Sequence, residues 1–554
     1  MKRIVIGLGL LLGVAACDEG GSNPCASGEE FVDGACLRPT AIELNTVGFL
    51  PGRAKRATSP RASESFQVVA EDGSVVFSGT PVARSEDQLT AYELDFTSVD
   101  QPGRYYVEVP GIGRSPTFTI GSDVFVGAFS ATMLSFYGQR CGTAVHFQYG
   151  GDVFAHGECH GADAFLNFVT GDGASKPSRF GWHDAGDYGK YTINGAFAAG
   201  LLLKAWEHFR PGLEGFELEI PERGGALPDL LDEVKFELEW LLTTQFDGGE
   251  VSHKVTAQDF ESFIAPEQDT QRRYFAPFGT AAAATFAAVT AQAARVYAEF
   301  DPEFSARCRD AALRAYAYLT AHPDEVAPDL QSFDTGAYTT SDRDDRAWAA
   351  AEIWETTGDP AALADFEARG SRLAVRVDWD WSDLGNLGLF TYVLSQRTGK
   401  NPEIASALEK QVIANADTIV STTNQHPYGR GVGAKYYWGT NGTVVRTALN
   451  LSVAQRLEPK DAYLDAIVAQ VDHVLGRNIY GRSLVTGIGY RPPMHPHHRP
   501  SASDGVIAPW PGLLVGGPQK TADTWVDDQE NYRTNEVAIN WSAALAYALA
   551  ALVR

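Results

Sequence analysis

The sequence has few basic residues for its acidic content. Over 554 residues, 45 lysine and arginine side chains stand against 70 aspartate and glutamate side chains, which gives a formal net charge of −25. A chain this negative repels nucleic acid and anionic membrane surfaces. Nucleic acid is therefore excluded as a partner, and a neutral polysaccharide fits the charge well.

The N-terminus lacks an apolar run long enough to span a bilayer comfortably. Two basic residues precede the apolar run 4–14, and the small pair Ala15-Ala16 then precedes Cys17. A cysteine at this place resembles a bacterial lipobox. We expect residues 1–17 to be a lipoprotein-type signal peptide, with lipidated Cys17 anchoring the protein to a membrane at the cell envelope or surface. The alternative is ordinary secretion with an incidental Cys17, and either way the chain is exported.

Residues 18–40 lack the apolar content that a folded domain needs. The stretch is rich in glycine, serine, proline and acidic residues, so we interpret it as a tether. Cys25 and Cys36 lie within it. In an oxidising compartment, a small disulfide-bonded loop is the simplest interpretation of that pair.

The rest of the chain changes its pattern once. Its length and its 44% hydrophobic content predict two to four domains. Short alternating runs between Asp-Gly and Pro-Gly turns predict an immunoglobulin-like β-sandwich over 41–122, as in Arg104–Val109. Residues 123–554 then show helical periodicity. About twelve helices are expected, near 126–139, 191–209, 227–245, 282–298, 304–321, 346–357, 361–372, 384–398, 402–420, 443–457, 461–475 and 537–552.

A fixed sequence repeat is missing from these helices. Its absence favours a closed double ring of helices over a solenoid. Long irregular segments interrupt the helices at 248–279, 424–442 and 477–532, and loops of that length in a compact domain are usually functional. The last of them contains Met494–Pro500, where imidazole and guanidinium groups are concentrated; a metal site or a packed polar loop is the alternative interpretation there.

The segment Arg179–Tyr191 carries the most informative motif. Asp184 and Asp187 are separated by the small residues Ala185 and Gly186, so both carboxylates could act on one water, one as general base and the other fixing its orientation. The spacing alone is weak evidence. A turn, a solvated face or a set of calcium ligands has the same pattern.

Three blocks in order carry a resemblance to a known family. They are GWHDAGDYGKY at 181–191, SLVTGIGYRPPMHPHHR at 483–499 and WVDDQENYRTNEVAIN at 525–540, with further similarity at 227–242, 436–442 and 513–518. Together they resemble glycoside hydrolase family nine, the inverting cellulases, from about 124 to 554. The β-domain resembles the immunoglobulin-like module that precedes the catalytic domain in one branch of that family.

The resemblance implies a fold and a set of roles. The fold is an all-α (α/α)6 barrel after the β-sandwich, which agrees with the helix count. Asp187 matches the general base, Asp184 its partner on the water, and Glu536 the general acid. We expect burial and nearby negative charge to raise the pKa of Glu536. The residues implied or considered as sugar contacts are His497, Arg499, Asp527, Tyr532, Trp438 and Trp182, with Trp381 and Trp510 as further candidates. Each of the four tryptophans could equally be core, and Asp527 could instead orient the acid.

The implied activity is hydrolysis of β-1,4-glucosidic bonds in cellulose-type β-glucans or cello-oligosaccharides. A family relative acting on mixed-linkage glucan, xyloglucan or chitosan oligomers is one alternative. A catalytically silent surface glycan-binding protein is another. One departure from the family pattern, Ser542-Ala543 after the acid, leads us to expect altered packing or specificity rather than loss of catalysis.

Two metal sites are expected, with no organic cofactor and a monomeric protein. Cys141, Cys159, His160 and His183 offer the Cys2His2 set of a closed structural zinc site, and the resemblance places zinc at these positions. A Cys141–Cys159 disulfide is the alternative, and a hydrolytic zinc is disfavoured because four protein ligands leave no open position. The acids of 340–345, with Asp344 and Asp345, resemble a calcium-binding region of the family; a solvated charge cluster is the alternative.

Overall fold

The computed structural model describes residues 30–32, 35–37, 41–86, 88–161 and 163–553. The chain divides into two compact units, residues 1–39 and residues 40–554. The first unit contains the antiparallel hairpin of β1 (Glu30–Val32) and β2 (Ala35–Leu37), inside the segment predicted as a tether. The predicted signal peptide and Cys17 lie outside the described residues, and so does Cys25 with its predicted disulfide.

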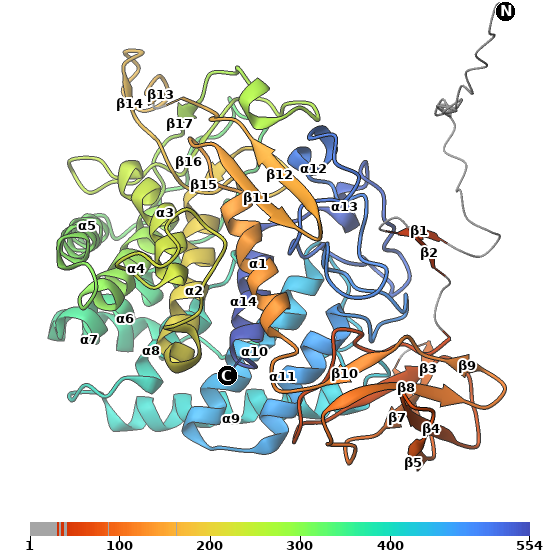
Figure 1. The fold of residues 1–554 in the computed structure, drawn as a ribbon. Coiled ribbons are helices and arrows are strands. Elements are labelled where there is room, and N and C mark those ends of the chain that lie inside the picture. Colours follow the sequence, from red (N-terminus) through yellow and green to blue (C-terminus); the bar gives the residue numbers. More distant parts are fainter. Residues whose placement is uncertain (1–29, 33–34, 38–40, 87, 162, 554) are drawn as a thin grey trace, which may run out of the picture. The chain divides into compact units, whose positions relative to one another are not determined.

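A β-sandwich opens the second unit, as predicted (Figure 1). One sheet has the order β10-β8-β4-β5, with β9 beside β8, and the other has the order β3-β7-β6. The strands are β3 (Arg56–Ser59), β4 (Phe66–Ala70), β5 (Val75–Gly79), β6 (Val82–Glu86), β7 (Leu89–Asp95), β8 (Gly103–Val109), β9 (Gly113–Arg114) and β10 (Phe118–Ile120).

The sandwich core follows from the alternation in its strands. Along β8, Tyr105, Val107 and Val109 are buried, whereas the residues between them are more exposed. Successive side chains of a strand point to opposite faces, so one face of this strand is apolar and lies against the other sheet. In the core, the ring of Phe49 meets the rings of Phe96 and Phe118 edge-on, with centroids 5.3 and 5.1 Å away.

Six inner helices form a closed ring in the described part of the second unit. Each contacts the next in the order α2, α4, α6, α8, α10 and α14, and α14 returns to α2. Their bounds are α2 (Thr192–Leu213), α4 (Thr280–Tyr297), α6 (Arg343–Thr357), α8 (Gly385–Leu394), α10 (Thr440–Leu457) and α14 (Ile539–Ala550).

Six outer helices pack on this ring, each against one or two inner helices (Figure 1). They are α1 (Val126–Gly138), α3 (Asp229–Thr244), α5 (Pro302–Ala321), α7 (Pro360–Gly370), α9 (Pro402–Gln425) and α11 (Asp461–Val474). The double ring is the predicted (α/α)6 barrel.

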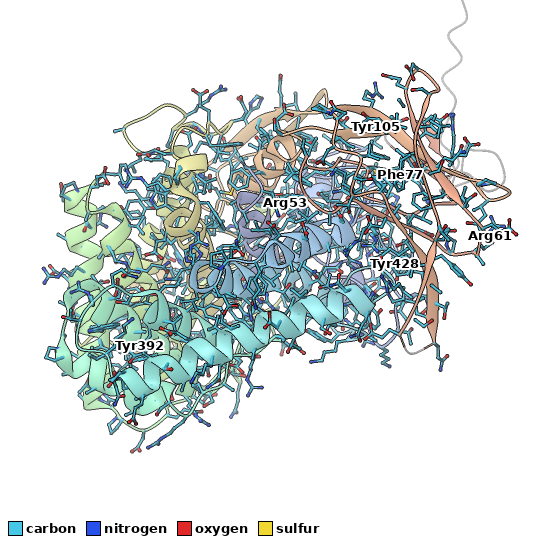
Figure 2. All side chains as sticks on the ribbon, turned by 90° about the horizontal axis from the view of Figure 1, so that it is seen from below. Arg53, Arg61, Phe77, Tyr105, Tyr392 and Tyr428 are labelled. Carbon is cyan, nitrogen blue, oxygen red and sulfur yellow. The ribbon has the colours of Figure 1, made fainter. Side chains whose placement is uncertain are left out.

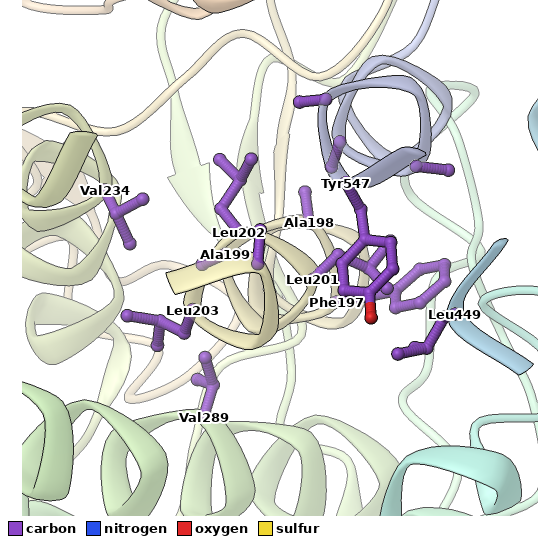
Figure 3. Close-up of a cluster of buried hydrophobic side chains, with 14 of the residues drawn as sticks. Phe197, Ala198, Ala199, Leu201, Leu202, Leu203, Val234, Val289, Leu449 and Tyr547 are labelled. Atoms are coloured by element: carbon purple, nitrogen blue, oxygen red, sulfur yellow. The ribbon is translucent and has the colours of Figure 1, made fainter. Parts of the chain in front are cut away.

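Burial explains which helices are inner. Inner helices such as α2 are apolar or small on nearly every side, since a helix enclosed by others buries all of its faces. Figure 3 shows side chains of α2 surrounded by Val234 of α3, Val289 of α4, Leu449 of α10 and Tyr547 of α14. Outer helices such as α9 bury one stripe only, which includes Leu408, Val412 and Ile419.

The sandwich is bonded to the barrel through buried polar groups. The guanidinium of Arg477 pairs with Glu93 of β7 at 2.9 Å, and the amide of Asn45 donates to Asp472 of α11 at 2.8 Å. At the rim, Arg53, labelled in Figure 2, donates to Asp461 at the start of α11 at 3.1 Å. Polar bonds of this kind fix the register of two domains more than apolar contact alone.

The barrel also contains short elements that periodicity did not reveal. Short strands link its loops: β11 (Val145–Tyr149), β12 (Asp152–His156), β13 (Asp163–Phe165), β14 (Ser175–Pro177), β15 (Lys190–Tyr191), β16 (Lys254–Thr256) and β17 (Tyr274–Phe275). The other short elements are the 3-10 turn η1 (Pro266–Gln268) and the short helices α12 (Arg499–Ser503) and α13 (Tyr532–Asn535). The predicted helical periodicity of residues 123–554 did not include these short elements, because runs of two to five residues are too short to show a period. Across the described residues, we find no helix with both the length and the apolar character that crossing a membrane requires.

Candidate active site

A small cavity lies where five inner helices begin. Its volume is about 80 Å³, and its walls come mainly from the segments that lead into α2, α6, α8, α10 and α14. Because inner helices of the ring start at the same end, side chains far apart in sequence meet there. The lining residues are Asp184, Ala185, Asp187, Tyr191, Phe260, Gly336, Tyr338, Asp380, Trp381, Trp438, Glu536, Ala538, Asn540 and Trp541.

Asp184 is fully enclosed and holds two side-chain hydrogen bonds. Asn194, in the first turn of α2, donates to Oδ1 at 2.7 Å, and the hydroxyl of Tyr338 donates to Oδ2 at 2.7 Å. Burial, and then the charge of Asp187, raise the pKa of Asp184 to about 7. Both of its oxygens therefore have a fixed donor.

Asp187 differs from Asp184 in how its oxygens are used. The N–H of Gly189 and the hydroxyl of Tyr191 both donate to Oδ2, each at 2.9 Å. Among the described residues, none donates a hydrogen bond to Oδ1, and Asp187 lines the cavity. Asp187 therefore has the oxygen that can take a proton from a water, whereas both oxygens of Asp184 are already bonded.

Glu536 reaches the cavity from the segment before α14. Its backbone pairs with His497, and its carbonyl accepts a hydrogen bond from the N–H of Gly516 at 2.8 Å. Burial raises the pKa of Glu536 well above its ordinary value of 4.5, and the charges of Asp187 and Asp184 raise it further. Arg499 and the N–H of Gly186 oppose this. The expected raised pKa of the acid is confirmed, and it leaves Glu536 able to carry a proton.

The turn between the aspartates needs a glycine for reasons of space. A Cβ at Gly186 would lie 2.3 Å from the carbonyl oxygen of His497 and 2.9 Å from its ring. Such a contact cannot be accommodated without moving the backbone that joins Asp184 to Asp187. The glycine therefore allows the histidine segment to approach the catalytic turn.

Two glutamates of α3 hold the same turn from the barrel side. The N–H of Trp182 donates to Glu237 at 2.7 Å, and its indole N–H donates to Glu233 at 2.8 Å. Both carboxylates are fully buried, and Arg140 pairs with Glu233 at 3.0 Å. Sequence reasoning missed these positioning residues. The signal was present, since two acids four residues apart interrupt an otherwise leucine-rich helix face.

The aromatic candidates divide into cavity walls and core. Trp438 and Trp381 line the cavity, and Trp438 keeps 48% of its surface exposed. The prediction that Trp182 contacts sugar is wrong, because the side chain is 0% exposed and packs on Phe136 at 4.8 Å. Trp510 is likewise core. Trp541, which the sequence analysis did not single out, is a wall.

The polar candidates of the last long loop lie beside the cavity rather than in its lining. His497 is half-buried against Gly186, and its Nδ1 lies 2.7 Å from the carbonyl of Gln529. Asp527 accepts from the N–H groups of Met494 and His495, at 2.8 and 2.9 Å. It therefore holds the histidine segment in place.

Arg499 and Tyr532 also differ from the simple expectation of sugar contacts. Arg499 is 7% exposed and pairs with Glu261 at 2.6 Å. Tyr532 is 49% exposed, and its ring centroid lies 6.0 Å from that of His497. Tyr532 is open to solvent near the cavity, whereas Arg499 is already bonded within the protein.

The four predicted zinc ligands come together. Their ligand atoms all lie within 4.8 Å of one another. Nε2 of His183 lies 3.2 Å from Nδ1 of His160, Sγ of Cys141 lies 3.5 Å from the same Nδ1, and Sγ of Cys159 lies 3.8 Å from Nε2 of His183. A tetrahedral zinc ion requires about 3.3 Å between two nitrogens and about 3.6 Å between sulfur and nitrogen. The donor set fits a metal ion, and both cysteines are free thiols, which excludes the disulfide alternative in this structure.

The predicted calcium region contains an unusual carboxylate. Asp345 is 0% exposed, and neither of its oxygens has a hydrogen-bond partner within the described residues. Burial raises its pKa well above the ordinary value, and the charges of Asp344 and Asp342 add to this. Asp344 accepts from the N–H of Leu384, and Asp342 pairs with Arg346 at 2.7 Å. Asp345 is thus a buried carboxylate beside two other acids, with no hydrogen-bond partner among the described residues.

Ser542 marks the predicted departure from the family pattern. It is buried in α14, and its hydroxyl has no hydrogen-bond partner among the residues that the structure describes. It does not line the cavity. The difference therefore concerns packing under the acid, not contact with a ligand.

Known proteins match this chain over most of its length. The family model for "Glycosyl hydrolase family 9" matches residues 125–549, and the model for "Cellulase N-terminal ig-like domain" matches residues 38–114. Endoglucanase D of Acetivibrio thermocellus is 47% identical over 519 residues, covering 92% of this chain and 83% of that protein.

Two solved structures of family 9 endoglucanases are similar to this chain over most of its length. A metagenome-derived glycoside hydrolase family 9 endoglucanase superimposes with a TM-score of 0.86 at 36% identity, covering 92% of this chain and 98% of that one. The Zn-binding triple mutant of the family 9 endoglucanase J30 gives a TM-score of 0.86 at 33% identity, covering 91% and 100%.

Proposed function

This chain belongs to glycosyl hydrolase family 9, and from that premise we propose that it is an inverting endo-β-1,4-glucanase acting on cellulose-type β-glucans. The observation that carries the proposal is the meeting of Asp184, Asp187 and Glu536 in the walls of one cavity, where burial raises the pKa of Glu536 well above its ordinary value. An inverting glycosidase needs one carboxylic acid that is protonated and one carboxylate that activates water. The relative named endoglucanase D supports the same activity.

In the proposed reaction, water attacks the anomeric carbon in a single displacement. Asp187 takes a proton from the water as its oxygen bonds to that carbon. The bond from the carbon to the glycosidic oxygen breaks on the opposite face, and Glu536 gives its proton to the departing oxygen. One molecule of water is consumed and the configuration at the carbon is inverted.

Asp184 has a different part in this scheme. Its two oxygens are held by Asn194 and Tyr338, so its orientation is fixed. It lies close enough to Asp187 for the charge of Asp187 to raise the pKa of Asp184. We assign Asp184 to fixing the water for Asp187.

The aromatic walls provide the surface for the glucan chain. Trp381 and Trp438 line the cavity from segments before α8 and α10, and Trp541 lines it from α14. Flat apolar rings stack on the C–H faces of pyranose rings, which a β-1,4-glucan presents on both sides. The net charge of −25 also favours a neutral substrate.

A zinc ion at Cys141, Cys159, His160 and His183 would have a structural part. When bound, it would link His183, the neighbour of Asp184, to Cys141 and to the adjacent pair Cys159 and His160. Four protein ligands would leave no coordination position of the ion open for chemistry. The carboxylate of Asp269 lies 3.3 Å from Nε2 of His160 and would orient that ring. The similarity to the Zn-binding triple mutant of the family 9 endoglucanase J30 is consistent with this proposal.

A calcium ion at Asp344 and Asp345 is the second metal proposal. A hard divalent cation prefers carboxylate oxygens, and Asp345 offers two without partners. Added Ca²⁺ should raise the melting temperature of the wild type, and Asp345→Asn should remove that response. An Asp345→Asn variant that still responds fully would contradict the assignment.

We also propose that the protein is exported and held at the cell envelope by a lipid on Cys17. The support is the sequence of residues 1–17 alone. An anchored enzyme would process soluble glucans or oligosaccharides near the surface rather than erode crystals. Mass spectrometry of the mature N-terminus tests the anchor, and equal turnover of crystalline and soluble cellulose would count against the surface role.

The function is tested by product analysis. Wild type, Glu536→Gln and Asp187→Asn are incubated with soluble β-1,4-glucan, and NMR follows the first anomer formed. The wild type should release α-configured ends, and both variants should lose at least about a hundredfold in rate. Glu530→Gln, an exposed change in the same loop as the acid, is the control. Binding without release by the wild type would instead identify a glycan-binding protein, and β-configured products would reject the mechanism.

A further inference from the structure

The loop Gln258–Ile264 crosses the edge of the active site, and three contacts anchor it. The N–H of Asp334 donates to the carbonyl of Gln258 at 2.8 Å. The hydroxyl of Tyr188, next to the base, donates to the carbonyl of Ile264 at 2.6 Å. Arg499 holds the middle of the loop at Glu261. The loop is thus fixed to the catalytic turn and not free.

Arg499 joins this loop to the catalytic turn through all three nitrogens of its guanidinium. Nε and Nη2 donate to the carbonyl of Glu261 at 3.1 and 2.9 Å, and Nε lies 2.6 Å from the Glu261 carboxylate. Nη1 donates at 2.7 Å to the carbonyl of Gly186, which stands between Asp184 and Asp187. The side chains of Arg499 and Glu261 are 8% and 7% exposed. Moving either partner of this buried ion pair would leave a buried charge without compensation. The pair therefore holds the loop in one position relative to the turn.

Phe260, the residue before Glu261, is the exposed aromatic residue of this loop. Phe260 keeps 49% of its surface exposed and lines the cavity with the catalytic carboxylates. The guanidinium of Arg499 lies 5.8 Å from the centroid of its ring and 5.4 Å from that of Phe263. An apolar ring turned to water at a catalytic cavity is the surface on which a pyranose ring stacks.

We propose that Phe260 is a substrate-contacting residue that sets affinity for the glucan chain. In the same proposal, Glu261 is a positioning residue: through Arg499, it fixes the position of Phe260 relative to the turn at Gly186. The inference rests on the proposed glucanase function. It assigns Arg499 to the protein's own architecture, in place of the direct sugar contact expected from the sequence. Nothing in the bridge exchanges a proton with substrate, so its effect is through geometry.

The two residues should have separable kinetic effects on cello-oligosaccharides of increasing length. Phe260→Ala should raise KM about tenfold on the longer oligosaccharides and leave kcat within about threefold, because it removes a stacking surface but no reacting group. Phe260→Tyr should retain wild-type KM. Glu261→Gln should lower kcat about tenfold or more, because a small displacement of the catalytic turn is costly. Glu261→Asp should recover part of that loss.

Asp259→Asn is the matched control, since Asp259 is an exposed acid of the same loop. Its kcat and KM should equal those of the wild type. A KM for Phe260→Ala within twofold of the wild type at every chain length would overturn the role of Phe260, and this exposed position tests the idea even if Glu261→Gln fails to fold. A folded Glu261→Gln with lower thermal stability and unchanged kcat would overturn the role of Glu261. A wild type that releases no product from any β-1,4-glucan would reject the proposed function itself, which is a different result from an active wild type with unaffected variants.

Discussion

The hydroxyl of Tyr191 donates a hydrogen bond to Oδ2 of Asp187 at 2.9 Å, four residues along the same segment. The tyrosine is 2% exposed, and its oxygen also accepts the N–H of Gly336 at 3.1 Å. With the N–H of Gly189 on the same carboxylate oxygen, the base has one oxygen committed to the protein and one left for water. The hydrogen bond thus decides which way the base faces.

Tyr191→Phe should therefore slow the reaction without weakening substrate binding. Loss of a hydrogen bond to a charged group amounts to about 1.5 to 3 kcal/mol, so kcat should fall about tenfold to a hundredfold while KM changes by less than about threefold. Steady-state kinetics on cello-oligosaccharides measures both. Tyr297→Phe removes a buried tyrosine hydroxyl that bonds to the carbonyl of Leu231, far along the chain, and is the control for lost stability. Equal kcat for Tyr191→Phe and wild type would contradict the assignment.

Glu536→Gln should fail most on substrates whose leaving group needs a proton. On cello-oligosaccharides the rate should fall about a thousandfold or more, whereas an aryl cellobioside with a strongly acidic phenol should lose far less, because that leaving group departs as an anion. In the wild type, activity should decline as pH rises through the pKa of Glu536, which burial places well above 4.5. Rates on both substrates across pH test this. Equal losses on the two substrates would argue against Glu536 as the acid.

The three carboxylates of the cavity, Asp184, Asp187 and Glu536, could be singled out from the sequence because each lies in a contiguous motif. Their partners could not. Tyr338 reaches Asp184 from 154 residues away, and Glu261 reaches Arg499 from 238 residues away, so only the closed ring of helices brings them together. Arg499 was expected to face sugar, and it turned inward because the loop supplies a buried counter-charge.

The twelve long helices were predictable for a different physical reason. Each is long enough to show its apolar period, and α1 to α11 and α14 fall close to the predicted ranges. The strands β13 to β17 have two or three residues each and pair across loops, so local sequence holds no signal for them. Trp182 shows that closeness in sequence to a cavity residue does not by itself place a side chain in the cavity. It is two residues from Asp184, yet it is buried on Phe136 while Asp184 lines the cavity.

Glu43 should make the stability of the protein depend on pH. Its side chain is 5% exposed beside the barrel, one of its oxygens has no partner in the described part of the chain, and burial raises its pKa from 4.5 to about 8. A carboxyl whose pKa is raised by folding costs nothing below pH 4.5, and its cost grows as pH rises and is complete above pH 8.

Glu43→Gln should therefore be more stable than the wild type at pH 9, by up to about 5 kcal/mol, with a difference that shrinks toward pH 4.5. Denaturant unfolding at several pH values measures it. Glu64→Gln, on the exposed surface of the sandwich, is the control and should show no such trend. A pH-independent difference between Glu43→Gln and wild type would contradict the buried, uncharged state of this side chain.

Removal of zinc should destabilise the catalytic turn before it affects chemistry. The four ligand atoms would enclose the ion, and His183 is the residue next to Asp184. A chelator should therefore lower the melting temperature by several degrees while the remaining folded enzyme keeps its kcat at low temperature. Cys159→Ala should lower the zinc content measured by atomic absorption. Cys308→Ala removes a buried thiol of α5 outside the cluster and should keep full zinc content. Immediate loss of all activity on chelation, with the fold intact by circular dichroism, would instead assign zinc to the reaction itself.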